Sequence, residues 1–177
     1  MAKKNKNSNL NWIIKIVIIT FIISFAFSGV SEMLIPNLNI FFGILIVIIF
    51  VLIGVIFDMI GVAITSCEEV PFHAKSARKI KGAKTAVKLI KNADKMSSFC
   101  NDVIGDICGI LSGSAGVAIS NSLINNFNLN PFFTTLFITA IIASLTIGGK
   151  AIGKKIAINN NTKIVYLFSK ILSIFIR

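Results

Sequence analysis

The chain has 177 residues, of which 55% are hydrophobic, and its mean hydropathy is +0.85. A water-soluble domain cannot hide that share of apolar residues behind a polar exterior, so the composition excludes an ordinary soluble protein. The formal net charge of +11 has the sign of a nucleic-acid binder, but the lysines lie between long apolar runs and form no single basic stripe with aromatic residues. We therefore expect no nucleic-acid partner, and we expect anionic lipid headgroups to lie beside these lysines.

Four apolar segments approach the length of about 20 residues that a helix needs to cross a bilayer. They are residues 12–28, 40–65, 100–124 and 131–149. An Asn-rich turn separates the last two, and Pro131 is suited to the first position of the fourth helix. The pattern predicts an all-α integral membrane protein with about four transmembrane helices.

The first segment also has a second interpretation, as a cleaved signal peptide. A basic start and an apolar middle precede the small residues Ala26, Ser28 and Gly29, as in secretory signals. The apolar run is long for a signal, which favours an additional N-terminal transmembrane helix over residues 12–28. The topology of the other three segments is the same in either case.

The basic residues predict the orientation, since cytoplasmic loops of membrane proteins are enriched in Lys and Arg. Basic residues precede the first segment, separate the second from the third, and follow the fourth, whereas residues 29–39 and 125–130 contain none. We therefore expect a multi-pass protein of the cell membrane with both termini in the cytoplasm. Residues 1–11 are then a basic cytoplasmic tail.

Two further segments have helical patterns outside the predicted spans. Residues 68–98 combine an apolar stripe with flanking lysines, which predicts basic cytoplasmic juxtamembrane helices. The stripe consists of Ile80, Ala83, Val87 and Ile90. These helices either lie on the inner membrane surface or present a solvated basic face that enforces the topology. Residues 162–177 are amphipathic and too short to span, so we expect a C-terminal interfacial belt helix.

The sequence contains little that is typical of an enzyme. Cys67, Cys100 and Cys108 lack metal-ligand spacing, so we interpret them as reduced packing residues. His73 is the single histidine, and no Ser/His/Asp, HExxH or CxxC arrangement surrounds it. We expect no catalytic activity.

Three carboxylates, Asp58, Asp102 and Asp106, lie in or beside the predicted spans, where an ionised side chain costs about 2.5–3.5 kcal/mol. Asp102 and Asp106 are four residues apart, so they share a helix face, and Asn101 adds a neutral oxygen. Such hard oxygen ligands suit Mg²⁺, and the topology puts Asp58 in the same half of the bilayer. We therefore predict a metal site of Asp58, Asn101, Asp102 and Asp106, with Mg²⁺ as the bound or transported ion. In the alternative, the carboxylates neutralise nearby lysines, above all Lys150.

Four short motifs follow one another in a recognisable order. Residues 57–66 read Phe-Asp-Met-Ile-Gly-Val-Ala-Ile-Thr-Ser, residues 82–95 read Gly-Ala-Lys-Thr-Ala-Val-Lys-Leu-Ile-Lys-Asn-Ala-Asp-Lys, residues 105–106 are Gly-Asp, and residues 149–154 read Gly-Lys-Ala-Ile-Gly-Lys. In this order they resemble the transmembrane domain of the CNNM family, the CorB/CorC-type magnesium transporters, over residues 40–177. The resemblance implies a homodimeric transporter core for divalent cations, most of all Mg²⁺.

The chain departs from that family's pattern where the pattern carries charge. The family's Ser-Glu pair falls on Ile60 and Gly61, its third-helix glutamate on Lys150, and its helix-kinking proline on Gly153. An ammonium near a cation path opposes Mg²⁺, which leaves open a non-transporting accessory or scaffold protein of the same fold in which Lys150 replaces the ion. The family's CBS nucleotide-binding pair has no counterpart here, so we expect no regulation by ATP-Mg²⁺ within this chain.

Overall fold

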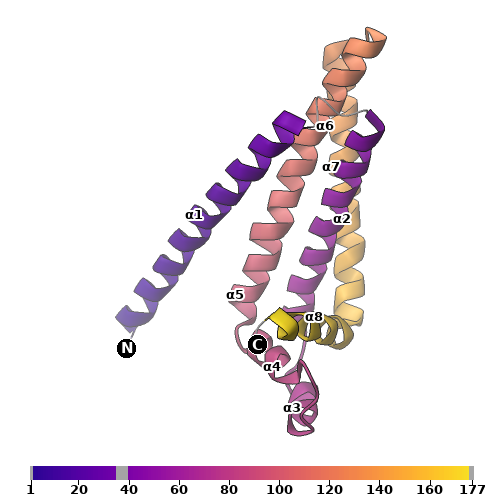
Figure 1. Ribbon diagram of the computed structural model, residues 1–177. Coiled ribbons are helices and arrows are strands. Elements are labelled where there is room, and N and C mark those ends of the chain that lie inside the picture. Colours follow the sequence, from indigo (N-terminus) through magenta and orange to yellow (C-terminus); the bar gives the residue numbers. More distant parts are fainter. Residues whose placement is uncertain (1, 35–39, 176–177) are drawn as a thin grey trace. The chain divides into compact units, whose positions relative to one another are not determined.

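The computed structural model describes residues 2–34 and 40–175, and the side chains of residues 12–29, 33 and 40–174 among them. Every secondary-structure element in this part of the chain is a helix (Figure 1). The elements are α1 (Ala2–Leu34), α2 (Ile40–Thr65), α3 (Val70–Ala77), α4 (Ala83–Lys91), α5 (Ala93–Ser98), the π-helix η2 (Phe99–Gly105), α6 (Asp106–Phe127), α7 (Pro131–Asn159) and α8 (Asn161–Phe175). The all-α fold class is confirmed.

Four helical stretches in the described residues are long and apolar enough to cross a membrane. They are Trp12–Gly29 within α1, Ile40–Thr65, the continuous run Ala93–Phe127 through α5, η2 and α6, and Pro131–Asn159. The four predicted spans are thereby confirmed, and the chain is a multi-pass membrane protein. The structure makes α7 longer than predicted, since this helix continues past residue 149 to Asn159.

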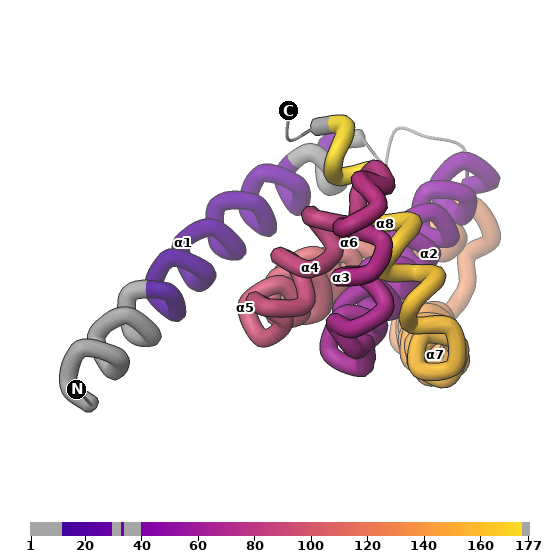
Figure 2. Tube along the Cα trace, turned by 90° about the horizontal axis from the view of Figure 1, so that it is seen from below, coloured from indigo at the N-terminus to yellow at the C-terminus, as the bar shows by residue number. Residues whose placement is uncertain are grey.

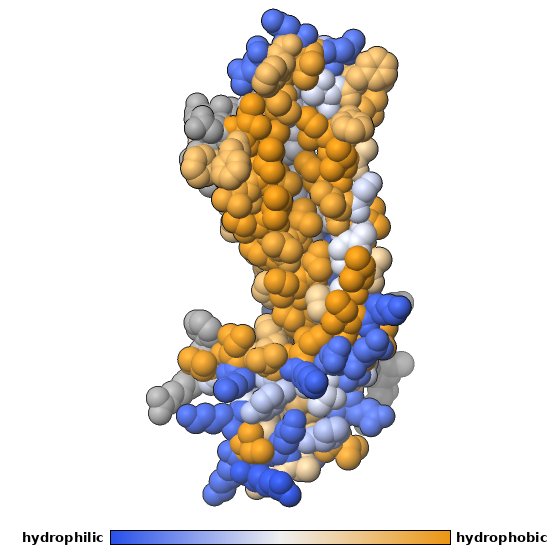
Figure 3. All heavy atoms as spheres, turned by 90° about the vertical axis from the view of Figure 1, so that its right-hand side faces the viewer, coloured by the Kyte–Doolittle hydropathy of each residue, from blue (hydrophilic) through white to orange (hydrophobic). Residues whose placement is uncertain are grey.

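Large apolar side chains cover the outside of the long helices. Phe25, Phe41 and Phe137 are each about 70% exposed, at 74%, 73% and 69%. Burying such a side chain is worth about 1.5–3 kcal/mol in water, so this exposure is stable only where lipid replaces water. Figure 3 shows the contrast, with hydrophobic residues covering the long helices and hydrophilic residues gathered over the short helices and at the turn between α6 and α7.

The turn between α6 and α7 forms as the sequence predicts. Asn128 adopts a positive φ of 49°, and Pro131 opens α7. The Asn130 side chain caps the new helix, because its Oδ1 accepts the backbone N–H of Phe132 at 3.1 Å and that of Phe133 at 3.5 Å. This cap satisfies two of the backbone N–H groups that lack a partner at the helix start, and it fixes where α7 begins.

The chain divides into two compact units, and the first comprises the described part of residues 1–51 and 107–144. Its core is formed by Val47, Ala115, Ile119 and Ile142. A Cβ at Gly116 would overlap Ile142, so glycine allows α6 and α7 to approach closely here. The hydroxyls of Ser120 and Thr135 lie 3.1 Å apart and link the same two helices.

The second unit comprises residues 52–106 and the described part of residues 145–177. Its core contains residues from α2, the following loop, α3, α4, η2, α7 and α8. They are Ile60, Ala63, Ile64, Cys67, Phe72, Ala86, Cys100, Ala157 and Val165. Within this unit, α4 contacts both α3 and α8, and Figures 1 and 2 agree in showing α8 beside α4.

Helix α4 is amphipathic, and its inner face contains the predicted stripe except for Ile80. Ala83, Ala86 and Leu89 are buried, and Lys84 and the other lysines of α4 are exposed. Ile80, which the sequence pattern assigned to the apolar stripe, precedes the helix and is 38% exposed. The reason is the turn at Gly82, which starts α4 at Ala83 and leaves Ile80 outside the helix, whereas Val87 and Ile90 pack against the core as predicted.

The turn before α4 depends on a glycine. Gly82 has a φ of +87°, which L side chains rarely adopt, and a Cβ there would lie 3.0 Å from the Lys170 backbone of α8. Glycine therefore permits both the turn into α4 and the close approach of α8. The structure forms helices in both predicted segments outside the spans, and their position at a membrane surface stays a prediction.

Candidate functional site: carboxylates and lysines of the second unit

Glycines bring α7 against α2 in the second unit. A Cβ at Gly153 would lie 2.7 Å from Met59 Cγ, and one at Gly149 would lie 2.9 Å from Val55 Cγ2. These two glycines are four residues apart, so they form one smooth face of α7 that allows the backbones to approach. A lysine follows each glycine directly in the sequence. The close packing of α7 on α2 therefore places Lys150 and Lys154 near the carboxylates.

The first lysine, Lys150, pairs with Asp106. Its Nζ donates a hydrogen bond to Asp106 Oδ1 at 3.1 Å, and the Lys150 side chain is only 19% exposed. A Cβ at Gly105 would lie 3.7 Å from the same Nζ, so the glycine before Asp106 leaves room for the ammonium. This contact is a charge-assisted hydrogen bond, stronger than one between neutral groups.

The second lysine, Lys154, lies beside Asp58. Asp58 is buried on α2, at 4% exposure, and its Oδ2 lies 3.7 Å from Lys154 Nζ. That separation gives electrostatic attraction but no hydrogen bond, and Oδ2 has no hydrogen-bond partner among the described residues. The Lys154 side chain is 52% exposed, so the pair joins a buried anion to a cation that reaches solvent.

Asn101 lies in η2 against the same helix as Asp58. Its Nδ2 donates to Ser97 Oγ at 3.3 Å, while its buried Oδ1 has no hydrogen-bond partner in the described part of the chain. A Cβ at Gly61 would overlap the Asn101 amide, so this amide lies directly on α2 at Gly61. Because Gly61 follows Asp58 by three residues, Asn101 and Asp58 lie on one face of α2 about one turn apart.

The fourth predicted ligand stays apart from these contacts. Asp102 is exposed, and no ion pair joins it to another described residue. Over residues 2–34 and 40–175, no group of three or more His, Cys, Asp or Glu side chains is placed to hold a metal ion. The structure thus brings Asp106 to Lys150 and Asp58 to Lys154 and Asn101, and a joint site of all four ligands stays a prediction.

The pairing of Asp58 with Lys154 was missed by the sequence analysis. The spacing of the lysines could have predicted it. Lys150 and Lys154 are four residues apart, so they share one face of a helix. Glycine at 149 and 153, one position earlier in each case, marks that face as the one turned to another helix.

The three cysteines are buried thiols, as expected of packing residues. Cys67 follows α2 outside the membrane-spanning segment, and its Sγ lies 3.8 Å from Thr162 Oγ1. Burial raises the pKa of the Cys67 thiol, and the charge of Glu68 adds to the rise. The hydrogen bond with Thr162 and the nearby Lys75 act in the opposite direction without cancelling the effect of burial.

Comparisons of this chain with protein-family models, with curated proteins and with solved structures gave no match. The resemblance to the CNNM family accordingly depends on the motifs quoted above.

Proposed function

We propose that this chain is a non-transporting accessory or scaffold membrane protein with a CNNM-like core, in which lysine replaces the ion. The observation that supports this function best is the hydrogen bond of 3.1 Å between Lys150 Nζ and Asp106 Oδ1. Lys150 stands where the family pattern has a glutamate, so an ammonium lies beside a carboxylate that the sequence analysis assigned to a cation.

Electrostatics explains why such a lysine opposes transport. Two unit charges 4 Å apart interact by about 4 kcal/mol at an effective dielectric constant of 20, and a divalent ion doubles that repulsion to about 8 kcal/mol. Mg²⁺ also requires oxygen ligands at about 2.0–2.1 Å, so it cannot share Asp106 Oδ1 with an ammonium that donates a hydrogen bond to the same atom. Under this proposal Lys150 satisfies Asp106 permanently and lets the helices insert.

A second candidate function, divalent cation transport, is favoured by a different observation. In the described part of the chain, Asp58 Oδ2 and Asn101 Oδ1 are buried oxygen atoms without a hydrogen-bond donor, on one face of α2. Buried acceptors of this kind are uncommon, and a cation would satisfy both. Lys154 Nζ, at 3.7 Å and half-exposed, forms no hydrogen bond there and can withdraw toward solvent. In this candidate the ion would be Mg²⁺.

Thermal unfolding of the purified protein in detergent separates the two functions. Wild type, Asp58→Asn and Lys150→Glu are melted with and without Mg²⁺, with Ca²⁺ and Na⁺ as control ions and Lys155→Gln as the matched lysine control. The scaffold proposal expects no Mg²⁺ response in wild type and a gain of response in Lys150→Glu. A Mg²⁺-specific rise in wild type that Asp58→Asn loses would instead establish the transporter candidate.

We also propose that both termini face the cytoplasm and that the protein is a homodimer. The distribution of basic residues supports the orientation, and the family resemblance supports the dimer. Cysteine introduced at Asn126 or at Lys91 tests the orientation, because a membrane-impermeant maleimide added outside intact cells should label the first and spare the second. Mass measurement of the detergent-solubilised protein tests the dimer.

A further inference from the structure

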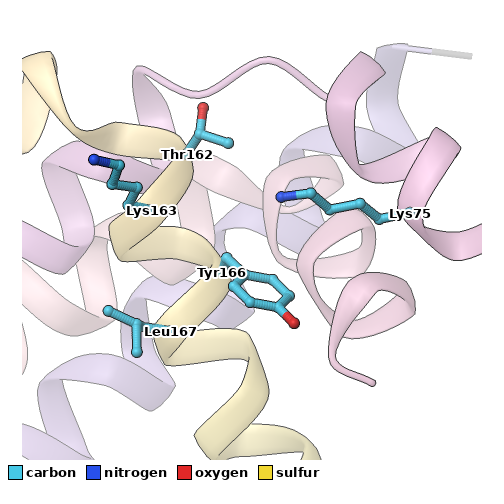
Figure 4. A pocket seen from close by; sticks show the side chains of 5 residues that line it. All are labelled: Lys75, Thr162, Lys163, Tyr166 and Leu167. Atoms are coloured by element: carbon cyan, nitrogen blue, oxygen red, sulfur yellow. The ribbon is translucent and has the colours of Figure 1, made fainter. Parts of the chain in front are cut away.

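A cationic pocket lies at the start of α8 in the second unit. It has a volume of about 260 Å³ and is lined by Lys75 of α3 and by Thr162, Lys163, Tyr166 and Leu167 of α8. The lining includes two lysines and no acidic side chain, and most of the surface that it presents is apolar, so the positive charge lies at its edge. Figure 4 shows Lys75 reaching from α3 toward α8, whereas the Lys163 side chain leaves α8 in another direction.

Lys75 is held in place by aromatic rings. Its Nζ lies 4.8 Å from the centroid of the Tyr166 ring and 5.4 Å from that of Phe72, which is fully buried. Such cation–π contacts position an ammonium without using its N–H donors, so the donors stay available to an anion. The pocket therefore presents a fixed positive charge.

An apolar groove adjoins this pocket. It has a volume of about 230 Å³ and runs between α2 and α8, where Ile56, Met59, Phe168 and Ile171 are among the residues that line it. Leu167 lines both the groove and the cationic pocket, so the two cavities meet at one side chain. Ile56 and Ile171 are more than half exposed, at 52% and 54%, so the groove is open to the surroundings.

We propose that the pocket and groove together bind one anionic phospholipid. Its phosphate group lies at the Lys75 ammonium, and Lys163 adds a second positive charge at the rim. One acyl chain follows the groove between α2 and α8 past Leu167. The phosphate is then at the basic pocket and the acyl chain at the apolar groove, as expected for a lipid at a membrane–water interface.

The charge and the polarity of the two cavities favour this occupant. A free phosphate ion would satisfy the lysines but would leave the groove uncovered, whereas a neutral lipid would fill the groove and leave the ammonium groups without a counter-charge. Only an amphipathic anion matches both parts. This inference is independent of ion transport and holds for either function proposed above.

Native mass spectrometry of the full chain tests the proposal. The protein is purified in detergent with equal amounts of phosphatidylglycerol and phosphatidylcholine, and the retained lipids are counted on the folded protein. Wild type is expected to retain phosphatidylglycerol in preference to phosphatidylcholine. Lys75→Gln should lower that preference by about fivefold, the effect of losing one basic residue near a membrane surface.

The matched control is Lys84→Gln, because Lys84 is an exposed lysine of α4 that lines neither cavity. It should retain the wild-type preference, while Leu167→Gln, at the junction, should reduce the total lipid retained. Equal losses in Lys75→Gln and Lys84→Gln would overturn the proposal in favour of general surface charge. Competition by inorganic phosphate that leaves no lipid bound would overturn it in favour of a free-anion site.

Discussion

Removing the charge of Lys150 is the most direct perturbation of the candidate site. Lys150→Gln leaves the Asp106 carboxylate without its ammonium, and Asp106→Asn leaves the largely covered ammonium without its counter-ion. The double variant replaces both charges by neutral amides. Together with wild type, these proteins form a double-mutant cycle that measures how much stronger the ion pair is than the pair of amides.

The environment decides the expected size of that energy. An ion pair in water contributes about 0.2–1 kcal/mol, whereas an unpaired charge within a membrane costs about 2.5–3.5 kcal/mol. Asp106 opens α6 inside a candidate span and the Lys150 side chain is 19% exposed, but the Asp106 side chain is 64% exposed, so the expected energy lies between these two values. We expect each single variant to lose about 1–2 kcal/mol. The double variant should lose clearly less than the sum of the two.

Thermal unfolding in detergent measures the cycle, and 1 kcal/mol corresponds to a shift of about 2–4 °C for a chain of this size. Lys155→Gln serves as the control, with an expected change within about 0.5 kcal/mol. Strictly additive losses in the double variant would refute the reasoning, because they would show that the two side chains do not interact. A single variant that is more stable than wild type would refute it as well.

Three further predictions concern the fold around the site. Gly82→Ala should destabilise the protein by about 1–3 kcal/mol, since the positive φ and the Lys170 backbone both oppose a Cβ. The control is Gly109→Ala, which has open space around it and should not lower the melting temperature. Asn130→Ala should cost about 0.5–2 kcal/mol in the same thermal assay, through loss of the α7 cap. Because burial raises the pKa of the Cys67 thiol, its thiolate fraction at a given pH is smaller than that of an exposed cysteine, and site-resolved alkylation should still accelerate with pH where an exposed thiol has levelled off; a rate that levels off at the same pH as that of an exposed thiol would contradict this.

The helices could be predicted from the sequence because their signals are local. The apolar run at residues 40–65 coincides with α2 in both bounds, and Pro131 opens α7 as expected. The end of α7 could not be predicted, because the lysines after residue 149 resemble the start of a cytoplasmic loop. In the structure α7 continues to Asn159, with Gly153 and Ala157 buried against the rest of the unit.

The pairing of the charges could be predicted only in part, because it depends on which helix faces pack. The sequence alone offered Lys150 as a partner of Asp58 or Asp106, and the structure selects Asp106. The reason is the packing of α7, because Gly149 contacts Val55 and Gly153 contacts Met59 on α2. This packing places the Lys150 ammonium beside Asp106. Such a choice requires tertiary geometry that no single helix contains.

The two lysines differ in a way that bears on function. Lys150 is mostly covered and donates a hydrogen bond at 3.1 Å, so displacing it from Asp106 means breaking a short contact and moving an ammonium that has little access to water. Lys154 is half-exposed and 3.7 Å from a buried carboxylate oxygen, so its ammonium can turn toward solvent, but its departure leaves the Asp58 carboxylate unpaired unless another cation replaces it. A cation that replaced Lys154 beside Asp58 would therefore restore the lost charge pairing, whereas a cation at Asp106 would have to compete with the hydrogen-bonded Lys150 ammonium.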